Sequence, residues 1–306
     1  MLSGVIAVTD NDWYSTLAEN HIVDEVNFWR PGARRPQVTE GTPWLFKLHA
    51  PENAIAGVGF FKYYTELPIG IAWDWFETKN GARSLEEMLA RLARYRRETV
   101  TVASTVGCVL LSDVVFFERS QLVKPPTDWR AQIVSAKKYD LASGHGASVW
   151  NEVTERITMT QPRTLVADLA RREALGKPAL YTPRLGQGEF RAIVADAYRR
   201  QCAITGERVF PTLEAAHIKP FSEVKMHDVR NGVLMRSDLH RLFDKGYVTI
   251  EPDLRFTVSA RVRQEFKNGR EYYTLDGRTV SVPSNPRLQP AGENLEWHLR
   301  NKFLAS

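Results

Sequence analysis

The sequence contains little cysteine and no pattern of paired cysteines. Cys108 and Cys202 are its two cysteines, and neither belongs to a CxxC motif. This excludes a disulfide framework and also a structural zinc knuckle built on cysteine pairs. The sequence also contains no internal repeat and no low-complexity tract.

Signals for export or membrane insertion are also missing. The N-terminal stretch lacks a basic start and soon turns polar, unlike a signal peptide. The most apolar run, residues 100–117, contains Ser112 and Asp113, so it predicts two β-strands and not a membrane span. We therefore expect a cytoplasmic protein, of bacterial type, that does not associate with a membrane.

The composition is that of an ordinary globular protein. The 306 residues suit two domains, with 43% hydrophobic and 25% charged residues. The net charge is +5, and the positive excess lies in residues 178–306. A basic half favours a polyanionic partner such as nucleic acid, although many enzymes reach this modest charge without binding one.

Residues 214–244 carry the strongest chemical pattern. His217 ends an apolar strand, Asn231 opens an Asn-Gly turn, and His240 lies in the second turn of a helix. A neutral imidazole at a strand end can take a proton from water near neutral pH, which is what phosphodiester hydrolysis requires. His240 and Asp244 are four residues apart and share a helix face, so they predict part of a site for a cation. We expect Asn231 to hold the loop.

This stretch, with AHIKP, then NG, then LHRLFD, resembles the HNH nuclease motif of the ββα-metal fold. The order of segments across most of residues 184–300 is similar to that of bacterial HNH endonucleases. The resemblance implies a catalytic set of His217, Asn231 and His240 and a divalent metal, Mg²⁺ or Mn²⁺, bound by His240 and Asp244. The family carries an Asp or His ligand just before the first His, where this chain has Ala216. Either Glu214 or water would fill that place.

The N-terminal part is rich in strand signals. Strands are predicted at 4–10, 42–51 and 53–64, with a further pair in 102–119. One helix interrupts them at 84–97, where Ser84 is a good N-cap and Glu87 completes a capping box. Short strands around a few helices predict a small curved sheet or barrel.

This part is similar to the PUA-like superfamily in its EVE, ASCH or SRA branches. The similarity rests on DNDWYS, EVNFWRPG, WLFKLHAP, IAGVGFF and GCVLLSDVVFF. It implies a pocket that holds a modified or flipped base between aromatic rings. The candidate stacking residues are Trp13 and Trp29, both expected in loops, and Trp73 and Trp75. Asp74, Asp12 or Asn27 would accept a hydrogen bond from a cytosine amino group, and Arg30 would meet a phosphate. Core packing of these tryptophans is the alternative.

Between these parts, residues 131–183 read as a linker with a helix at 164–175. A Gly-rich loop then leads into a helix with Phe190, Ile193, Val194 and Ala197 on one face. Arg184 and Arg191 near this junction would contact the DNA backbone, or the junction is a plain connection. A hairpin is predicted to lead to His217, with strands at 246–266 and 272–283 and a closing helix at 293–304.

The sequence thus predicts an α+β chain with an N-terminal PUA-like domain (1–130), a helical linker (131–183) and a C-terminal ββα-metal HNH domain (184–306). The combination resembles a modification-dependent restriction endonuclease acting on double-stranded DNA with 5-methylcytosine or 5-hydroxymethylcytosine. One HNH site cuts one strand, so we expect a homodimer, at least on DNA. The alternatives are a nucleic-acid-binding module with a degenerate nuclease and a general or homing HNH nicking enzyme.

Overall fold

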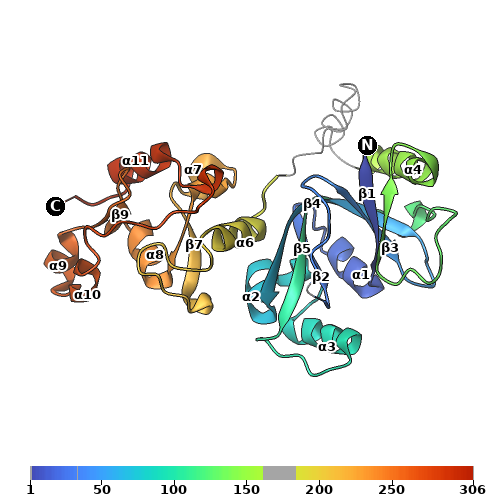
Figure 1. Cartoon of the computed structure of the whole chain (residues 1–306), viewed down its shortest axis with the longest axis horizontal. Helices are drawn as coiled ribbons and strands as arrows, with labels where there is room; N and C mark the ends of the chain where they lie inside the picture. The colour runs from blue at the N-terminus through green and yellow to red at the C-terminus, as the bar shows by residue number, and fades with distance from the viewer. Residues whose placement is uncertain (1, 33, 161–183, 306) are drawn as a thin grey trace. The chain divides into compact units, whose positions relative to one another are not determined.

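The chain divides into two compact units, Met1–Gly186 and Gln187–Ser306. The computed structural model describes residues 2–32, 34–160 and 184–305 (Figure 1). The helix expected at 164–175 lies outside the described residues. The mixed helix-and-strand class predicted from the sequence is confirmed in both units.

The first unit is built on one six-stranded sheet in the order β2-β5-β4-β3-β1-β6. β1 and β3 run parallel, whereas the other neighbouring pairs are antiparallel. The strands are β1 (Ser3–Thr9), β2 (Glu25–Arg30), β3 (Pro43–Leu48), β4 (Ile55–Pro68), β5 (Thr105–Phe116) and β6 (Ala136–Asp140). The helices are α1 (Asn11–Glu19), α2 (Ile69–Phe76), α3 (Leu85–Arg96) and α4 (Gly144–Thr160), with short 3₁₀ turns at Glu77–Asn80 and Arg119–Gln121.

The register of β4 shifts against both of its neighbours. Such bulges bend a strand and increase its twist, which suits the curved sheet expected from the sequence. β5 is a single strand, so the prediction of two strands in 100–117 is wrong. Ser112 is fully buried within the strand, and Asp113 adopts a left-handed backbone (φ 49°) without ending it.

The first unit extends well past the boundary predicted at residue 130. β6 pairs with β1, and α4 buries Val149, Trp150, Val153 and Ile157 against the sheet residues Ile6, Leu45 and Phe60. These four helix positions lie on one apolar face, which explains why residues 136–160 pack against the sheet as part of the first unit and not as a linker.

The second unit contains two small antiparallel sheets, β7–β8 and β9–β10, and several helices. Its strands are β7 (Leu213–His217), β8 (Gly232–Arg236), β9 (Val248–Ile250) and β10 (Phe256–Val258). Its helices are α6 (Gln187–Ala197), α7 (Phe221–Val224), α8 (Ser237–Asp244), α9 (Arg261–Phe266), α10 (Arg270–Tyr273) and α11 (Gly292–Asn301). Short 3₁₀ turns lie at Phe210–Thr212, Val229–Asn231 and Pro286–Leu288.

α6 packs closely on the β7–β8 hairpin. Phe190 and Val194 are buried there, as predicted, whereas Ile193 and Ala197 are only half-buried. A Cβ on Gly232 would lie 2.6 Å from a Val194 methyl and 2.9 Å from the Phe190 ring, so the close approach requires glycine. β7 pairs with β8 and not with residues 202–206, and 272–283 contains no strand, so those two predictions are wrong. The closing helix is confirmed as α11.

Among the described residues, no helix is both long enough and apolar enough to cross a membrane.

Candidate active site

The elements β7, β8 and α8 form a ββα unit that carries the His-Asn-His residues. His217 ends β7 opposite Gly232, the first residue of β8, and α8 follows β8 directly. His240 lies in the middle of α8 and Asp244 at its end. The strand and helix positions predicted for both histidines are therefore confirmed.

His217 is held between rings. Its imidazole stacks on Phe190, with ring centroids 4.1 Å apart and planes 12° apart. Burial, reinforced by the nearby charges of His227, His240 and Arg191, lowers the pKa of His217 to about 4. His217 is therefore neutral near neutral pH, as a proton acceptor must be.

The contact that sequence reasoning missed is His227. Its Nδ1 lies 3.0 Å from His217 Nε2. His227 in turn stacks on Phe221 of α7, with centroids 4.4 Å apart. The only feature of the sequence that pointed to this contact was a histidine in the loop between β7 and β8.

Asn231 closes that loop. It is buried, its Oδ1 accepts from the Lys219 amide at 2.8 Å, and its Nδ2 donates to the Lys219 carbonyl at 2.9 Å. The expected Asn-Gly turn is wrong, because Asn231 ends a 3₁₀ turn and Gly232 has extended strand geometry (φ −123°, ψ 141°). The side chain thus joins the two ends of the 218–231 loop, which is the role expected for it.

His240 lies between two carboxylates. Its Nδ1 is 2.6 Å from Glu214 Oε2, and its Nε2 is 3.3 Å from Asp244 Oδ2. Glu214 and Asp244 are both exposed, whereas Ala216 is fully buried and offers no ligand atom. In the part of the chain that the structure describes, no three His, Cys, Asp or Glu side chains converge on one point.

The His240–Asp244 pair nevertheless fits a hydrated divalent ion. Two ligands at right angles around an ion, each about 2.1 Å from it, lie about 3 Å apart. The separation of His240 Nε2 and Asp244 Oδ2 is close to this value. Mg²⁺ commonly uses one or two protein ligands and completes its shell with water and phosphate oxygens. A carboxylate on the other ring nitrogen, here from Glu214, is the usual partner of a metal-binding histidine.

The first unit contains a cavity of about 320 Å³, lined by two predicted pocket residues and by one residue predicted to contact the DNA backbone. Trp13, Trp29 and Arg30 contribute to it, as do Phe28 and Tyr95, which the sequence analysis did not select. The prediction that Trp13 and Trp29 lie in loops is wrong. Trp13 lies in α1, where Asp10 caps the helix, and Trp29 lies in β2. Both are largely buried, so the cavity meets only part of each ring.

The other predicted pocket residues lie elsewhere. Trp73, Asp74 and Trp75 belong to α2 and are not among the described residues that line the cavity. Residues two apart on a helix point in divergent directions, so Trp73 and Trp75 cannot clamp one base. Asn27 is fully buried and donates to Asn80 Oδ1 at 2.9 Å, which makes it a core residue.

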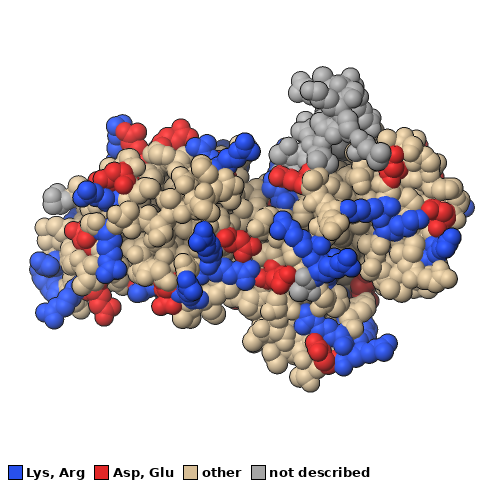
Figure 2. Space-filling model, viewed as in Figure 1, with Lys and Arg blue, Asp and Glu red and all other residues tan. Residues whose placement is uncertain are grey.

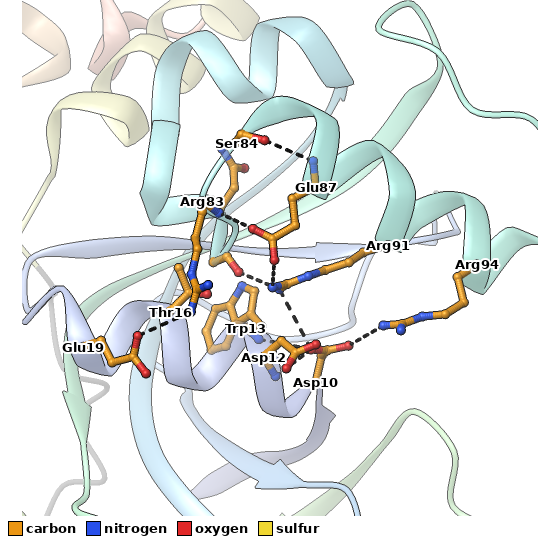
Figure 3. Close-up of polar contacts among 12 residues, drawn as sticks. Asp10, Asp12, Trp13, Thr16, Glu19, Arg83, Ser84, Glu87, Arg91 and Arg94 are labelled. Carbon is orange, nitrogen blue, oxygen red and sulfur yellow. Dashed lines mark hydrogen bonds and ion pairs between the residues drawn. The ribbon is translucent and has the colours of Figure 1, made fainter.

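Asp10 is the carboxylate that lines this cavity, in place of the predicted Asp12, whose side chain is exposed. Figure 3 shows Asp10 beside Arg91 and Arg94 of α3, at 3.9 Å and 3.5 Å. The Tyr95 hydroxyl donates to Asp10 Oδ2 at 2.5 Å. These contacts join the start of α1 to α3 and fix the wall of the cavity.

α3 itself begins with the predicted cap. Ser84 Oγ accepts from the Glu87 amide at 3.3 Å (Figure 3). The Glu87 carboxylate accepts from the Arg83 amide and also binds Arg91 at 2.6 Å. In a capping box Glu87 would accept from the amide of Ser84, so the contact is displaced by one residue.

The candidate DNA-backbone residues are spread over both units. Arg30 lines the cavity and its Nη1 donates to the Arg34 carbonyl. The amide of the exposed Arg184 donates to Asp113 Oδ2 within the first unit, whereas Arg191 lies in α6 of the second. Figure 2 shows Lys and Arg interspersed with Asp and Glu on the visible face of each unit, so the positive excess forms no single patch there.

Comparisons with known proteins agree with the ββα site. A family model described as an HNH endonuclease matches residues 202–251. No curated protein matches the chain. Among solved structures, an ASCH protein from Zymomonas mobilis has 11% identity and a TM-score of 0.33, covering 51% of this chain and 96% of its own. The modification-dependent restriction endonuclease TagI has 14% identity and a TM-score of 0.27, covering 90% of this chain and 74% of its own.

The segment that the family model matches contains His217, Asn231 and His240. The second unit therefore carries an HNH endonuclease domain, and the protein is a DNA-cleaving hydrolase.

Proposed function

We propose that the protein is a modification-dependent DNA endonuclease in which the second unit cuts and the first unit reads a modified cytosine. The observation that carries this proposal is the presence of a separate aromatic cavity in a chain whose other unit is an HNH nuclease. Its volume, about 320 Å³, is at the lower end of the range for small-molecule pockets, about 300–1,000 Å³. An HNH site that contacts mainly the DNA backbone gains selectivity from such a second site.

In the cutting unit, His217 is the general base. Its neutral imidazole takes a proton from a water molecule, and the water oxygen attacks the phosphorus as the bond to the leaving oxygen breaks. A bound divalent cation supplies stabilisation of the charge on the phosphate and the leaving oxygen. Arg191, whose charge acts on His217, is suited to attract the same phosphate.

We propose His240 Nε2 and Asp244 as the protein ligands of a Mg²⁺ or Mn²⁺ ion. Glu214 is better suited to orient His240 through Nδ1 than to bind the ion itself, because it contacts the opposite ring nitrogen. Water and a phosphate oxygen would complete the shell. Asn231 acts in this scheme by holding the loop.

In the reading unit, a flipped 5-methylcytosine or 5-hydroxymethylcytosine would enter the cavity beside Trp29 and Tyr95. Asp10, a carboxylate in the cavity lining, would accept from the cytosine amino group in addition to Tyr95, while Arg30 and Arg34 supply positive charge for flanking phosphates. These residues replace Asp74, Asp12 and Asn27 of the sequence-based hypothesis. We further propose a homodimer on DNA, since one HNH site cuts one strand.

The test is cleavage of plasmid DNA carrying modified cytosine, with Mg²⁺ or Mn²⁺ and with a chelator. The wild type should nick or linearise the plasmid only with metal. His217→Ala should lower the rate by about two to four orders of magnitude while leaving DNA binding intact. Wild-type activity in that variant would remove His217 as the base. DNA binding without any metal-dependent cleavage by the wild type would instead indicate a binding module with a degenerate nuclease.

A further inference from the structure

The general base His217 belongs to a cluster of four rings. Phe190 stacks on His217, His217 contacts His227, and His227 stacks on Phe221 and also lies 5.6 Å from Phe190 between ring centroids. Phe190 is fully buried, so the core fixes its side of the cluster, whereas Phe221 is exposed on α7. We call Phe190, His217, His227 and Phe221 the ring cluster.

The contact between His217 and His227 within the ring cluster is a hydrogen bond between two imidazoles. His217 Nε2 and His227 Nδ1 are 3.0 Å apart, so one nitrogen must carry the proton and the other must offer a lone pair. Among the described residues, His217 Nδ1 has no hydrogen-bond partner. The direction of this one bond therefore decides which nitrogen of His217 can receive a proton.

Only one direction of this hydrogen bond leaves His217 able to accept a proton from water. If His227 donated, His217 Nε2 would be occupied and Nδ1 would carry the ring proton, which leaves no lone pair for water. If His217 donates from Nε2, its Nδ1 has a lone pair and lacks a protein partner. In this arrangement His227 accepts through Nδ1.

We infer that His227 is a positioning residue for hydrolysis, which accepts from His217 Nε2 and so makes His217 Nδ1 the atom that takes the proton from water. This inference rests on the proposed role of His217 as general base. After the transfer, His217 is an imidazolium, and its Nε2–H bond to His227 becomes charge-assisted and stronger. The proton stays on Nδ1, and the hydroxide oxygen forms the new bond to phosphorus as the leaving oxygen departs.

The loop that carries His227 is built to hold it there. Asn231 ties one end of the loop to Lys219, and Asp228 Oδ1 accepts from the Arg230 amide at 2.8 Å next to His227. Phe221 covers the His227 ring from within the same loop. The hydrogen bonds restrict the loop, and the stacking of Phe221 restricts the His227 ring.

Two substitutions separate the hydrogen bond from the packing. His227→Phe keeps a ring for Phe221 to stack on but removes the acceptor. His227→Asn removes the ring but supplies an oxygen close to the position of Nδ1. Single-turnover cleavage by His227→Phe should fall about 10–100-fold, by analogy with the loss when the hydrogen-bond partner of a metal-binding histidine is removed. His227→Asn should recover most of the rate, and DNA affinity should be unchanged in both.

Nitrogen NMR of the wild type gives a readout that does not depend on activity. With ¹⁵N-labelled histidine, His217 should show a protonated Nε2 and an unprotonated Nδ1 near neutral pH, and His227→Phe should mix the two tautomers. Wild-type cleavage by His227→Phe, or a wild-type His217 protonated on Nδ1, would overturn the inference. If His217→Ala is inactive while His227→Phe is fully active, only the role of His227 fails. If His217→Ala remains active, the proposed base itself fails.

Discussion

The two functional regions differ in how their residues are distributed along the chain. The nuclease site comes from residues 214–244, one continuous ββα segment in which each element follows the last. The cavity of the first unit collects side chains from β1, α1, β2 and α3 and from the segments that connect the elements of this unit. A site built from adjacent elements is fixed by local geometry, whereas a cavity built from distant elements depends on the whole sheet.

The largest change in activity is expected from substitutions at the proposed metal ligand Asp244 and at Glu214, which contacts the other ligand, His240. Asp244→Asn should raise the Mg²⁺ concentration needed for half-maximal cleavage, and Glu214→Gln should lower metal affinity or activity by about 10–100-fold. Titrating Mg²⁺ in a plasmid nicking assay measures both. Arg241→Ala, which changes an exposed residue of the same helix, is the matched control. If Glu214→Gln had no effect while Asp244→Asn did, Glu214 would not orient His240.

A bulky side chain at the cavity mouth tests the reading site. Val134 lines the cavity and is 82% exposed, so Val134→Trp should narrow the cavity without disturbing the core. The ratio of cleavage rates on modified and unmodified DNA should fall about tenfold, the effect of roughly 1.4 kcal/mol. Val23→Trp, at an exposed valine of the same unit outside the cavity lining, should leave the ratio unchanged. An unchanged ratio in Val134→Trp would remove the cavity as the reader.

A smaller effect, on stability, is expected from the loop clamp, by which we mean the two hydrogen bonds between the Asn231 side chain and the Lys219 backbone. Asn231→Ala leaves the partly buried amide and carbonyl of Lys219 without their partner, so the free energy of unfolding of the protein should fall by about 1–3 kcal/mol. Denaturant unfolding followed by tryptophan fluorescence measures it. Asn301→Ala removes one exposed side-chain hydrogen bond and should cost no more than about 0.5 kcal/mol. Equal losses in the two variants would contradict the clamp.

The smallest effect concerns pH. Burial lowers the pKa of both His217 and His298 to about 4, against an ordinary value of 6.5. Between these values the unfolded chain binds protons that the folded chain does not, so stability is full above pH 6.5 and falls as the pH drops toward 4. Thermal unfolding of the wild type over this range should show the loss, and His298→Gln should reduce its slope. A melting temperature independent of pH would contradict these pKa values.

The local site could be predicted from the sequence for a physical reason. His240 and Asp244 meet because residues four apart share a helix face, and His217 projects from a strand end that the apolar run already indicated. His227 was missed because its contact depends on a loop of irregular geometry that no periodicity describes. The Asn-Gly pair misled for a similar reason, since tertiary pairing of β7 with β8 overrode the local turn preference.

The cavity could be predicted only in part. Trp13, Trp29 and Arg30 were selected for their chemistry, and the fold brings them together. Asp10, Phe28 and Tyr95 could not be found, because their neighbours are set by sheet order and helix packing. Trp73 and Trp75 looked equally suitable in the sequence, yet α2 carries them away from the cavity.

The most direct measurement compares cleavage of three plasmids of identical sequence that carry unmodified cytosine, 5-methylcytosine or 5-hydroxymethylcytosine. We predict faster cleavage of at least one modified plasmid by the wild type, with all cleavage strongly reduced in His217→Ala. Equal rates on all three plasmids, with the same dependence on His217, would contradict the reading role of the first unit and leave a general HNH nicking nuclease.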